Sequence, residues 1–136
     1  MNNVYVEKYD WNRPLVPGSI VCSQYSDFDG ERRQGIFLII YDETLDNSLL
    51  HNKNCVGLKL TTQNTLVNNY VVAINMELNK FLDNDSLVCC SKLHLLNKTK
   101  EIYKYLGQLD SYTYKRVVKV YSKFAREMQR QLLDRI

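Results

Sequence analysis

The sequence has few of the features that mark membrane or secreted proteins. Its longest apolar runs are five or six residues, whereas a helix that crosses a bilayer needs about 20. The start at Met1 lacks the basic and then apolar layout of a signal peptide. We therefore expect a cytoplasmic protein that makes no contact with a membrane.

Residues that bind metals are also scarce. The chain has 4 cysteines and 2 histidines, and no two cysteines have the C-x-x-C spacing of a zinc or redox motif. Three of the cysteines lie within apolar, strand-like runs, which favours reduced thiols in the core over disulfides. We expect no metal and no other cofactor.

What is present is the composition of an ordinary globular domain. The 136 residues are 45% hydrophobic and 24% charged, which is typical of one domain with its own core. The net charge is +3, and the last third of the chain holds much of the basic excess. We interpret those basic residues as the solvated face of a helix, with an RNA-binding surface as the less favoured alternative.

Short β-type segments fill most of the chain after a turn at Pro17-Gly18. The expected strands are residues 19–25, 36–41, 55–60, 70–74, 87–90, 92–96 and 102–106. The strand 36–41 is apolar on both faces, so we expect it to be the most buried element. Segments 55–60 and 70–74 are predicted to be neighbours in the sheet. Three other segments have different predictions: 26–35 as a mobile loop, 42–54 as a loop, and 77–82 as about one and a half helical turns. The close spacing of the strands is typical of a small barrel or sandwich.

The final segment predicts an amphipathic helix that begins at Ser111, with Asp110 or Ser111 as its N-cap. Apolar residues recur at intervals of three and four, with charges on the other side. They are Tyr114, Val117, Val118, Tyr121, Phe124, Ala125, Met128, Leu132 and Leu133. The chain as a whole is thus expected to be an α+β domain with a β-barrel core.

Several motifs together resemble the PemK/MazF family, the growth-arresting toxins of toxin–antitoxin pairs. The resemblance runs in order over residues 17–124, through Pro17-Gly18-Ser19-Ile20-Val21, Leu60-Thr61-Thr62-Gln63, Asp85-Ser86-Leu87-Val88 and Leu106-Gly107-Gln108-Leu109-Asp110. It implies one domain over residues 1–136. An N-terminal arm (1–16) would lead into an SH3-like β-barrel (17–110), which the C-terminal helix (111–136) would follow.

The family resemblance also implies a function, that of a homodimeric, metal-independent endoribonuclease that cleaves single-stranded RNA and inhibits growth. An antitoxin's disordered tail would occupy the same groove as the RNA. In such a reaction the RNA 2′-hydroxyl attacks the adjacent phosphorus, which requires a proton acceptor, a proton donor and groups that stabilise the developing charge.

The resemblance assigns catalysis to Thr61, at the end of the third expected strand, and to an arginine before the second. Here Gln34-Gly35 stands where the family has Arg-Pro, so Arg33 or Arg32 would have to supply the guanidinium. Further RNA-binding candidates are Gln34, Thr62, Gln63, Lys92 and Glu31, with Glu31 also a candidate proton acceptor.

Each of these residues also has a purely structural interpretation. Thr61 and Thr62 suit an edge strand, Arg32 and Arg33 suit a solvated loop, and His94 is expected to be a strand residue rather than a catalytic base. An alternative function follows, in which a catalytically inactive barrel, such as one encoded by a phage, inhibits a host protein or binds nucleic acid.

Overall fold

The computed structural model describes residues 15–27, 29–42, 54–62 and 70–135. Within these residues one sheet of seven strands precedes a single long helix. The elements are β1 (Ser19–Ser26), β2 (Arg32–Asp42), β3 (Asn54–Thr61), β4 (Val71–Ile74), β5 (Ser86–Cys89), β6 (His94–Asn97), β7 (Ile102–Gln108) and α1 (Ser111–Asp134). The predicted arm up to residue 14 and most of the predicted loop 42–54 lie outside the described residues.

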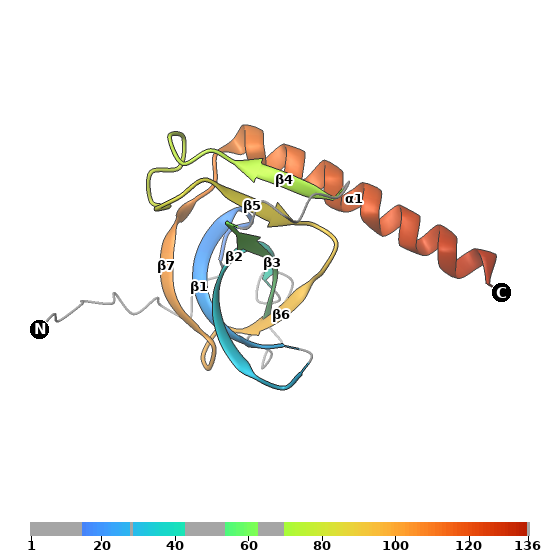
Figure 1. Ribbon diagram of the computed structural model, residues 1–136, viewed down its shortest axis with the longest axis horizontal. Helices are drawn as coiled ribbons and strands as arrows, with labels where there is room; N and C mark the ends of the chain where they lie inside the picture. The colour runs from blue at the N-terminus through green and yellow to red at the C-terminus, as the bar shows by residue number, and fades with distance from the viewer. Residues whose placement is uncertain (1–14, 28, 43–53, 63–69, 136) are drawn as a thin grey trace, which may run out of the picture.

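The strands pair antiparallel in the order β4-β5-β3-β2-β1-β7, and β6 pairs with β3 beside this path. Figure 1 shows that the sheet is strongly curved. Its two end strands, β4 and β7, do not pair with one another in the described part of the chain. The structure thus shows a mostly antiparallel, curved sheet with a C-terminal helix, and strand pairing does not close it into a barrel.

The predicted pairing of segments 55–60 and 70–74 is wrong, because β5 lies between β3 and β4. Val88 of β5 pairs with Leu60 on one side and with Val72 on the other. All three side chains are buried in the same core. Strand β5 comes after β3 and β4 in the sequence, yet it lies between them because both neighbours cover Val88. Sequence order alone does not reveal this arrangement.

The predicted mobile loop 26–35 is also mostly wrong, because β1 and β2 continue to pair as far as Ser26 and Arg32. Only residues 27–31 connect the two strands. The polar residues at the start of β2 are exposed, and their backbone groups are paired across the ladder. The charged residues led to the wrong prediction, because the exposed end of a strand also tolerates polar side chains.

Two apolar cores form on the two sides of the strands, because side chains alternate along each strand. Leu38 of β2 belongs to the core that also includes Leu58, Leu60 and Val117 of α1. Phe37 and Ile39, on the other side of β2, belong to a second core with Tyr25 and other residues. Strand β2 is therefore buried on both sides, as its continuous apolar run predicted.

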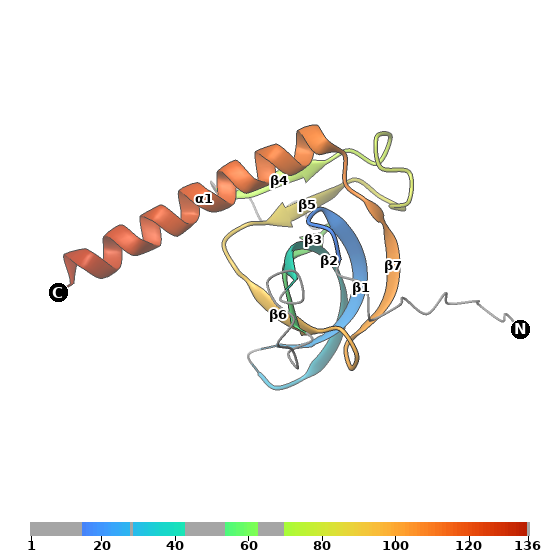
Figure 2. The same ribbon diagram turned by 180° about the vertical axis from the view of Figure 1, so that it is seen from behind.

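Helix α1 starts where the sequence predicted, and Asp110 is its N-cap. The Asp110 carboxylate accepts hydrogen bonds from the backbone N and the Oγ1 of Thr113, both at 2.9 Å. Val117 is fully buried, yet Met128, Leu132 and Leu133 are 42%, 61% and 62% exposed. Figures 1 and 2 show why: α1 runs beside β4 and then extends beyond the sheet.

Residues 77–82 form turns and not the predicted helical segment. Asn79 determines this conformation, because its buried side chain donates to Asn75 O and to Asp110 Oδ1. The Asp110 backbone N donates back to Asn79 Oδ1 at 3.1 Å. Asparagine side chains compete in this way with helical hydrogen bonding. The turn is thereby joined to the start of α1.

A buried ion pair joins β2 to the turn after β6. Lys98 Nζ lies 2.9 Å from Asp42 Oδ2, and both side chains are fully buried. The backbone N of Leu15 donates to the same carboxylate oxygen at 2.6 Å. The pair thus holds three segments together.

In the described residues, no helix is long and apolar enough to span a membrane.

Replacing Lys98 with Met should lower the free energy of unfolding by about 3 to 5 kcal/mol, because it leaves the Asp42 carboxylate buried without its cation. Urea unfolding would measure the loss. Lys100→Met is the matched control, since Lys100 is exposed and its replacement should change stability by less than about 0.5 kcal/mol. Equal effects of the two variants would contradict this role for the pair.

Candidate functional site

The residues predicted for the site divide between the two faces of β2. Tyr25 of β1 is paired with Arg33, and β1 and β2 stay in regular register from Arg33 to Leu38. Alternation therefore puts Arg33 on the same face as Phe37, and Arg32 and Gln34 on the opposite face. Arg32 and Arg33 are therefore not equivalent candidates for the guanidinium that Gln34 lacks, because their side chains lie on opposite faces of β2.

Strand β3 adds two polar side chains to the face of Arg33. Phe37 is paired with Lys59, so these two side chains share a face. Thr61 follows Lys59 by two residues and projects to that face as well. Both residues are half-buried. We call this group, Arg33, Lys59 and Thr61, the cationic face.

Gly35 makes the centre of the cationic face narrow. A Cβ atom on Gly35 would lie 3.2 Å from the Tyr25 ring and 3.3 Å from Lys59 Cε. The Lys59 ammonium lies over the Tyr25 ring, 4.9 Å from its centroid, where a cation is attracted to the aromatic face. The position that holds proline in the resembling family thus lets an aromatic ring and a lysine approach one another closely.

Acidic residues of the β1–β2 connection surround Arg33. Its Nε lies 3.0 Å from Asp27 Oδ2, and its Nη2 lies 3.3 Å from Asp29 Oδ2 and 3.1 Å from Glu31 Oε2. The hydrogen bond from the Glu31 backbone is the main cause that lowers the pKa of Asp29, and the Arg33 guanidinium contributes. The predicted guanidinium is therefore held by carboxylates in this structure.

Lys92 and His94 lie next to the cationic face. Lys92 Nζ is 4.0 Å from Asp27 Oδ1. The His94 ring packs edge-on against Tyr25 and Phe37, with centroids 5.5 and 5.1 Å apart. Burial lowers the pKa of His94 from 6.5, and the charges of Lys92 and Lys59 lower it further. His94 is therefore a neutral ring at neutral pH.

The other predicted residues face away from this group. Arg32 Nη1 contacts Glu101 Oε2 at 3.2 Å, and its Nη2 donates to Gln24 Oε1 at 3.0 Å. Gln34 Oε1 accepts a hydrogen bond from the Tyr103 hydroxyl. Arg32 and Gln34 are thus engaged on the side of β7.

Thr62 is separated from Thr61, and the last predicted residue cannot be placed. Thr62 lines a separate depression together with Ile36 and Lys104. Gln63 lies outside the described residues. The predicted set of site residues is therefore not one cluster.

Thiols and metal-binding groups offer no further chemistry in the described residues. All four cysteines are free, and burial raises the pKa of Cys90 to about 12, which keeps this thiol protonated. Within the same part of the chain, no three His, Cys, Asp or Glu side chains gather so that they could hold a metal ion. Proton transfer and charge stabilisation are the chemistry that the cationic face can offer.

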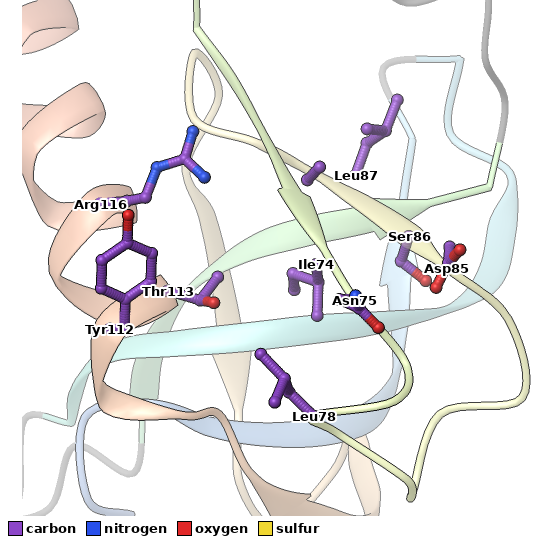
Figure 3. Close-up of a pocket in the computed structure, with 10 residues that line it drawn as sticks. Ile74, Asn75, Leu78, Asp85, Ser86, Leu87, Tyr112, Thr113 and Arg116 are labelled. Atoms are coloured by element: carbon purple, nitrogen blue, oxygen red, sulfur yellow. The ribbon is translucent and has the colours of Figure 1, made fainter.

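A second depression lies between the start of α1 and the β4–β5 edge (Figure 3). Tyr112 and Arg116 of α1 line one side, with Leu78 below them in the view and Asp85 across from them. Tyr112 and Leu78 are 71% and 66% exposed. None of the predicted site residues lines it, so we consider it separate from the cationic face.

Sequence reasoning missed Lys59 and Tyr25. Lys59 was visible as the one charged residue in the apolar run 55–60, and in a strand such a residue indicates a rim or a site. Tyr25 could not be found in this way, because its contact with Lys59 depends on the glycine at position 35. The paired strands β1, β2 and β3 bring these residues together from distant parts of the sequence.

Comparison with known proteins identifies the fold. No family model and no curated protein sequence matches the chain. Among solved structures, an endoribonuclease from a mycobacterial species in complex with its cognate antitoxin has a TM-score of 0.60 at 16% identity, covering 82% of this chain and 94% of that chain. A mycobacterial endoribonuclease also has a TM-score of 0.60 at 16% identity, with 83% and 92% covered. This chain therefore shares its fold with these endoribonucleases.

The His94 ring predicts a specific dependence of stability on pH. Because the pKa is lower in the folded protein than the ordinary 6.5, the unfolded chain takes up a proton first as pH falls, and stability is lost below about pH 6.5. His94→Gln removes this loss. The stability advantage of wild type over the variant should shrink between about pH 8 and about pH 5, by at most about 1 kcal/mol because water screens the ring.

Denaturant unfolding of both proteins at several pH values would test this dependence. Carboxylates that titrate in the same range affect both proteins and cancel in the difference. A difference between wild type and His94→Gln that stays constant with pH would show that the ring is not held neutral by burial.

Proposed function

We propose that this chain is a growth-inhibiting toxin of the PemK/MazF type, a metal-independent endoribonuclease that cleaves single-stranded RNA. One observation carries the proposal: Arg33, Lys59 and Thr61 share a face of a sheet whose fold is also found in endoribonucleases. Two cations and a hydroxyl on one face suit a phosphate, and phosphate contacts position a nucleic acid.

The reaction needs only groups of this kind. The RNA 2′-oxygen forms a bond to the adjacent phosphorus, the bond from phosphorus to the 5′-oxygen breaks, and a cyclic phosphate and a free 5′-hydroxyl result. Glu31 would accept the 2′ proton, and the Lys59 ammonium would supply one to the leaving oxygen. Arg33 and Thr61 would stabilise the charge on the phosphoryl oxygens.

Before substrate binds, the carboxylates around Arg33 occupy the positions that a phosphate would take on its guanidinium. A phosphate would have to displace at least one of Asp27, Asp29 and Glu31 from the guanidinium. Exposed ion pairs are worth roughly 0 to 1 kcal/mol each, so a dianionic transition state can compete with them. Displacement of Glu31 would also free the carboxylate that we assign as proton acceptor.

A cleavage assay tests the proposal. Purified protein is incubated with a long single-stranded RNA in the presence of a chelator, and cut fragments are quantified. We expect wild type to cleave, and Arg33→Gln or Thr61→Val to cleave about 100 to 1,000 times more slowly, the usual cost of losing one group that stabilises transition-state charge.

The chain offers matched controls for both substitutions. Arg32→Gln and Thr62→Val change the same residue types one position away, on side chains that face elsewhere. They should retain cleavage within about threefold, because surface changes away from the reacting groups have small effects. Equal losses in the test and control variants would contradict the assignment of the cationic face.

The second candidate function is a catalytically inactive protein that binds a host protein or nucleic acid. It is favoured by one observation, that Gln34 takes the place of the family's arginine and turns toward Tyr103. If wild type leaves RNA intact in the assay while its expression still arrests growth, the endoribonuclease proposal fails and this candidate stands.

We further propose that the chain forms a homodimer and that an antitoxin binds it. Residues 1–136 would make one domain, in which residues 17–110 are an SH3-like barrel. The similar endoribonuclease solved with its cognate antitoxin supports a protein partner. A shallow groove on one copy becomes a channel when two copies meet. Light scattering should return about twice the chain mass of 16.0 kDa, and a monomer at high concentration would refute the dimer.

A further inference from the structure

Helix α1 carries a row of cations that the cationic face does not use. Its residues lie on one side of the helix because they follow one another at intervals of three and four. They are Lys115, Lys119, Lys123, Arg126 and Arg130, and we call them the basic row. All five side chains are exposed, and successive members are about 4.5 to 6 Å apart along the helix axis.

The basic row is not neutralised by the protein itself. None of its five residues forms an ion pair with any other described residue, whereas Arg32, Arg33, Lys92 and Lys98 each contact a carboxylate. The acidic residues of α1 are Glu127 and Asp134, too few to balance the row. A continuous stretch of positive potential therefore lies along the helix.

The opposite side of α1 explains why the row faces solvent. Tyr114, Val117 and Tyr121 pack into the core beneath the helix, and the Phe124 ring lies 5.1 Å from the Tyr70 ring. This apolar side fixes the first four turns on the sheet. Beyond it the helix continues past the sheet (Figure 2), so the row extends away from the body of the protein.

We propose that the basic row binds the phosphate backbone of nucleic acid. The inference deepens the proposed function, because it assigns to the row the part of the RNA substrate that lies outside the cationic face. Lysine and arginine along one face of a helix, without counter-charges, are the usual electrostatic footprint of a phosphate chain. Such contacts depend on charge alone, so the row would hold RNA of any sequence.

Two other partners fit the row less well. A helix that lies on a bilayer inserts its apolar face between the lipids, and here that face is occupied by the sheet core along the first four turns. The centre of a protein interface is apolar and poor in charge, whereas five charges follow one another along this side of α1 and the exposed Tyr112 and Val118 lie only beside its start. A phosphate chain requires neither apolar insertion nor an apolar centre.

Binding to a fluorescent oligouridine with 2′-O-methyl groups tests the inference, because this ligand has no 2′-hydroxyl and cannot be cut. Fluorescence anisotropy is recorded between about 50 and about 200 mM salt. Lys119→Gln with Lys123→Gln should weaken binding about tenfold at the lower salt and reduce the slope of log K against log salt by about 1.4, or 0.7 for each lost contact.

The matched control is Lys80→Gln with Lys100→Gln, which changes the net charge equally at exposed positions off the helix. It should bind within about twofold of wild type, because the contribution of a distant exposed charge is screened by salt. Glutamine is a good helix former, so α1 stays intact in the first double variant, which circular dichroism checks.

Equal loss of binding in the two double variants would overturn the inference, since net charge and not the row would then control affinity. Tighter binding of polyglutamate, or of anionic vesicles, than of the oligouridine at the same salt would overturn it too. Wild type that binds through the row but leaves RNA uncut refutes the endoribonuclease proposal alone. Protein that cuts RNA but binds equally without the row refutes the basic row alone.

Discussion

The alternation of side chains along β2 is the constraint on which the rest of the structure depends. This strand is paired on both sides, so its residues must project alternately into two different environments. Leu38 enters one core and Phe37 the other. The rule continues at the exposed start of the same strand, where Arg33 lies on the face of Lys59 and Gln34 lies on the opposite face, beside Tyr103. Core packing thus determines which arginine shares a face with Thr61.

Most elements of the fold could be predicted from local sequence patterns, and their arrangement could not. The apolar run 36–40 predicted a doubly buried strand, and Asp110 predicted the start of α1, because both signals lie within a few residues of the chain. The insertion of β5 between β3 and β4 depends on Val88 contacting two distant strands. Residues 77–82 escaped prediction because Asn79 bonds to Asp110, 31 residues away.

The sequence named some residues of the cationic face as candidates, but it did not show which of them lie on the same face. Arg33, Thr61 and Lys92 were named from the sequence, and the register explains why Arg33 and Thr61 share a face. Treating residues 26–35 as a loop hid the consequence that neighbouring residues point apart. The acidic partners of Arg33 lie within six residues of it, yet only the tight connection between β1 and β2 shows that all of them reach the same guanidinium.

The buried pair of Asp42 and Lys98 has a consequence for the order of folding. Its partners are 56 residues apart, and Leu15 is a further 27 residues from Asp42 along the chain. Closing such long loops costs chain entropy that only a largely formed sheet can offset. We therefore expect the pair to form late, after the transition state for folding. A contact that forms after the transition state slows unfolding but leaves the folding rate almost unchanged. The strength of this ion pair would therefore determine how slowly the native protein unfolds.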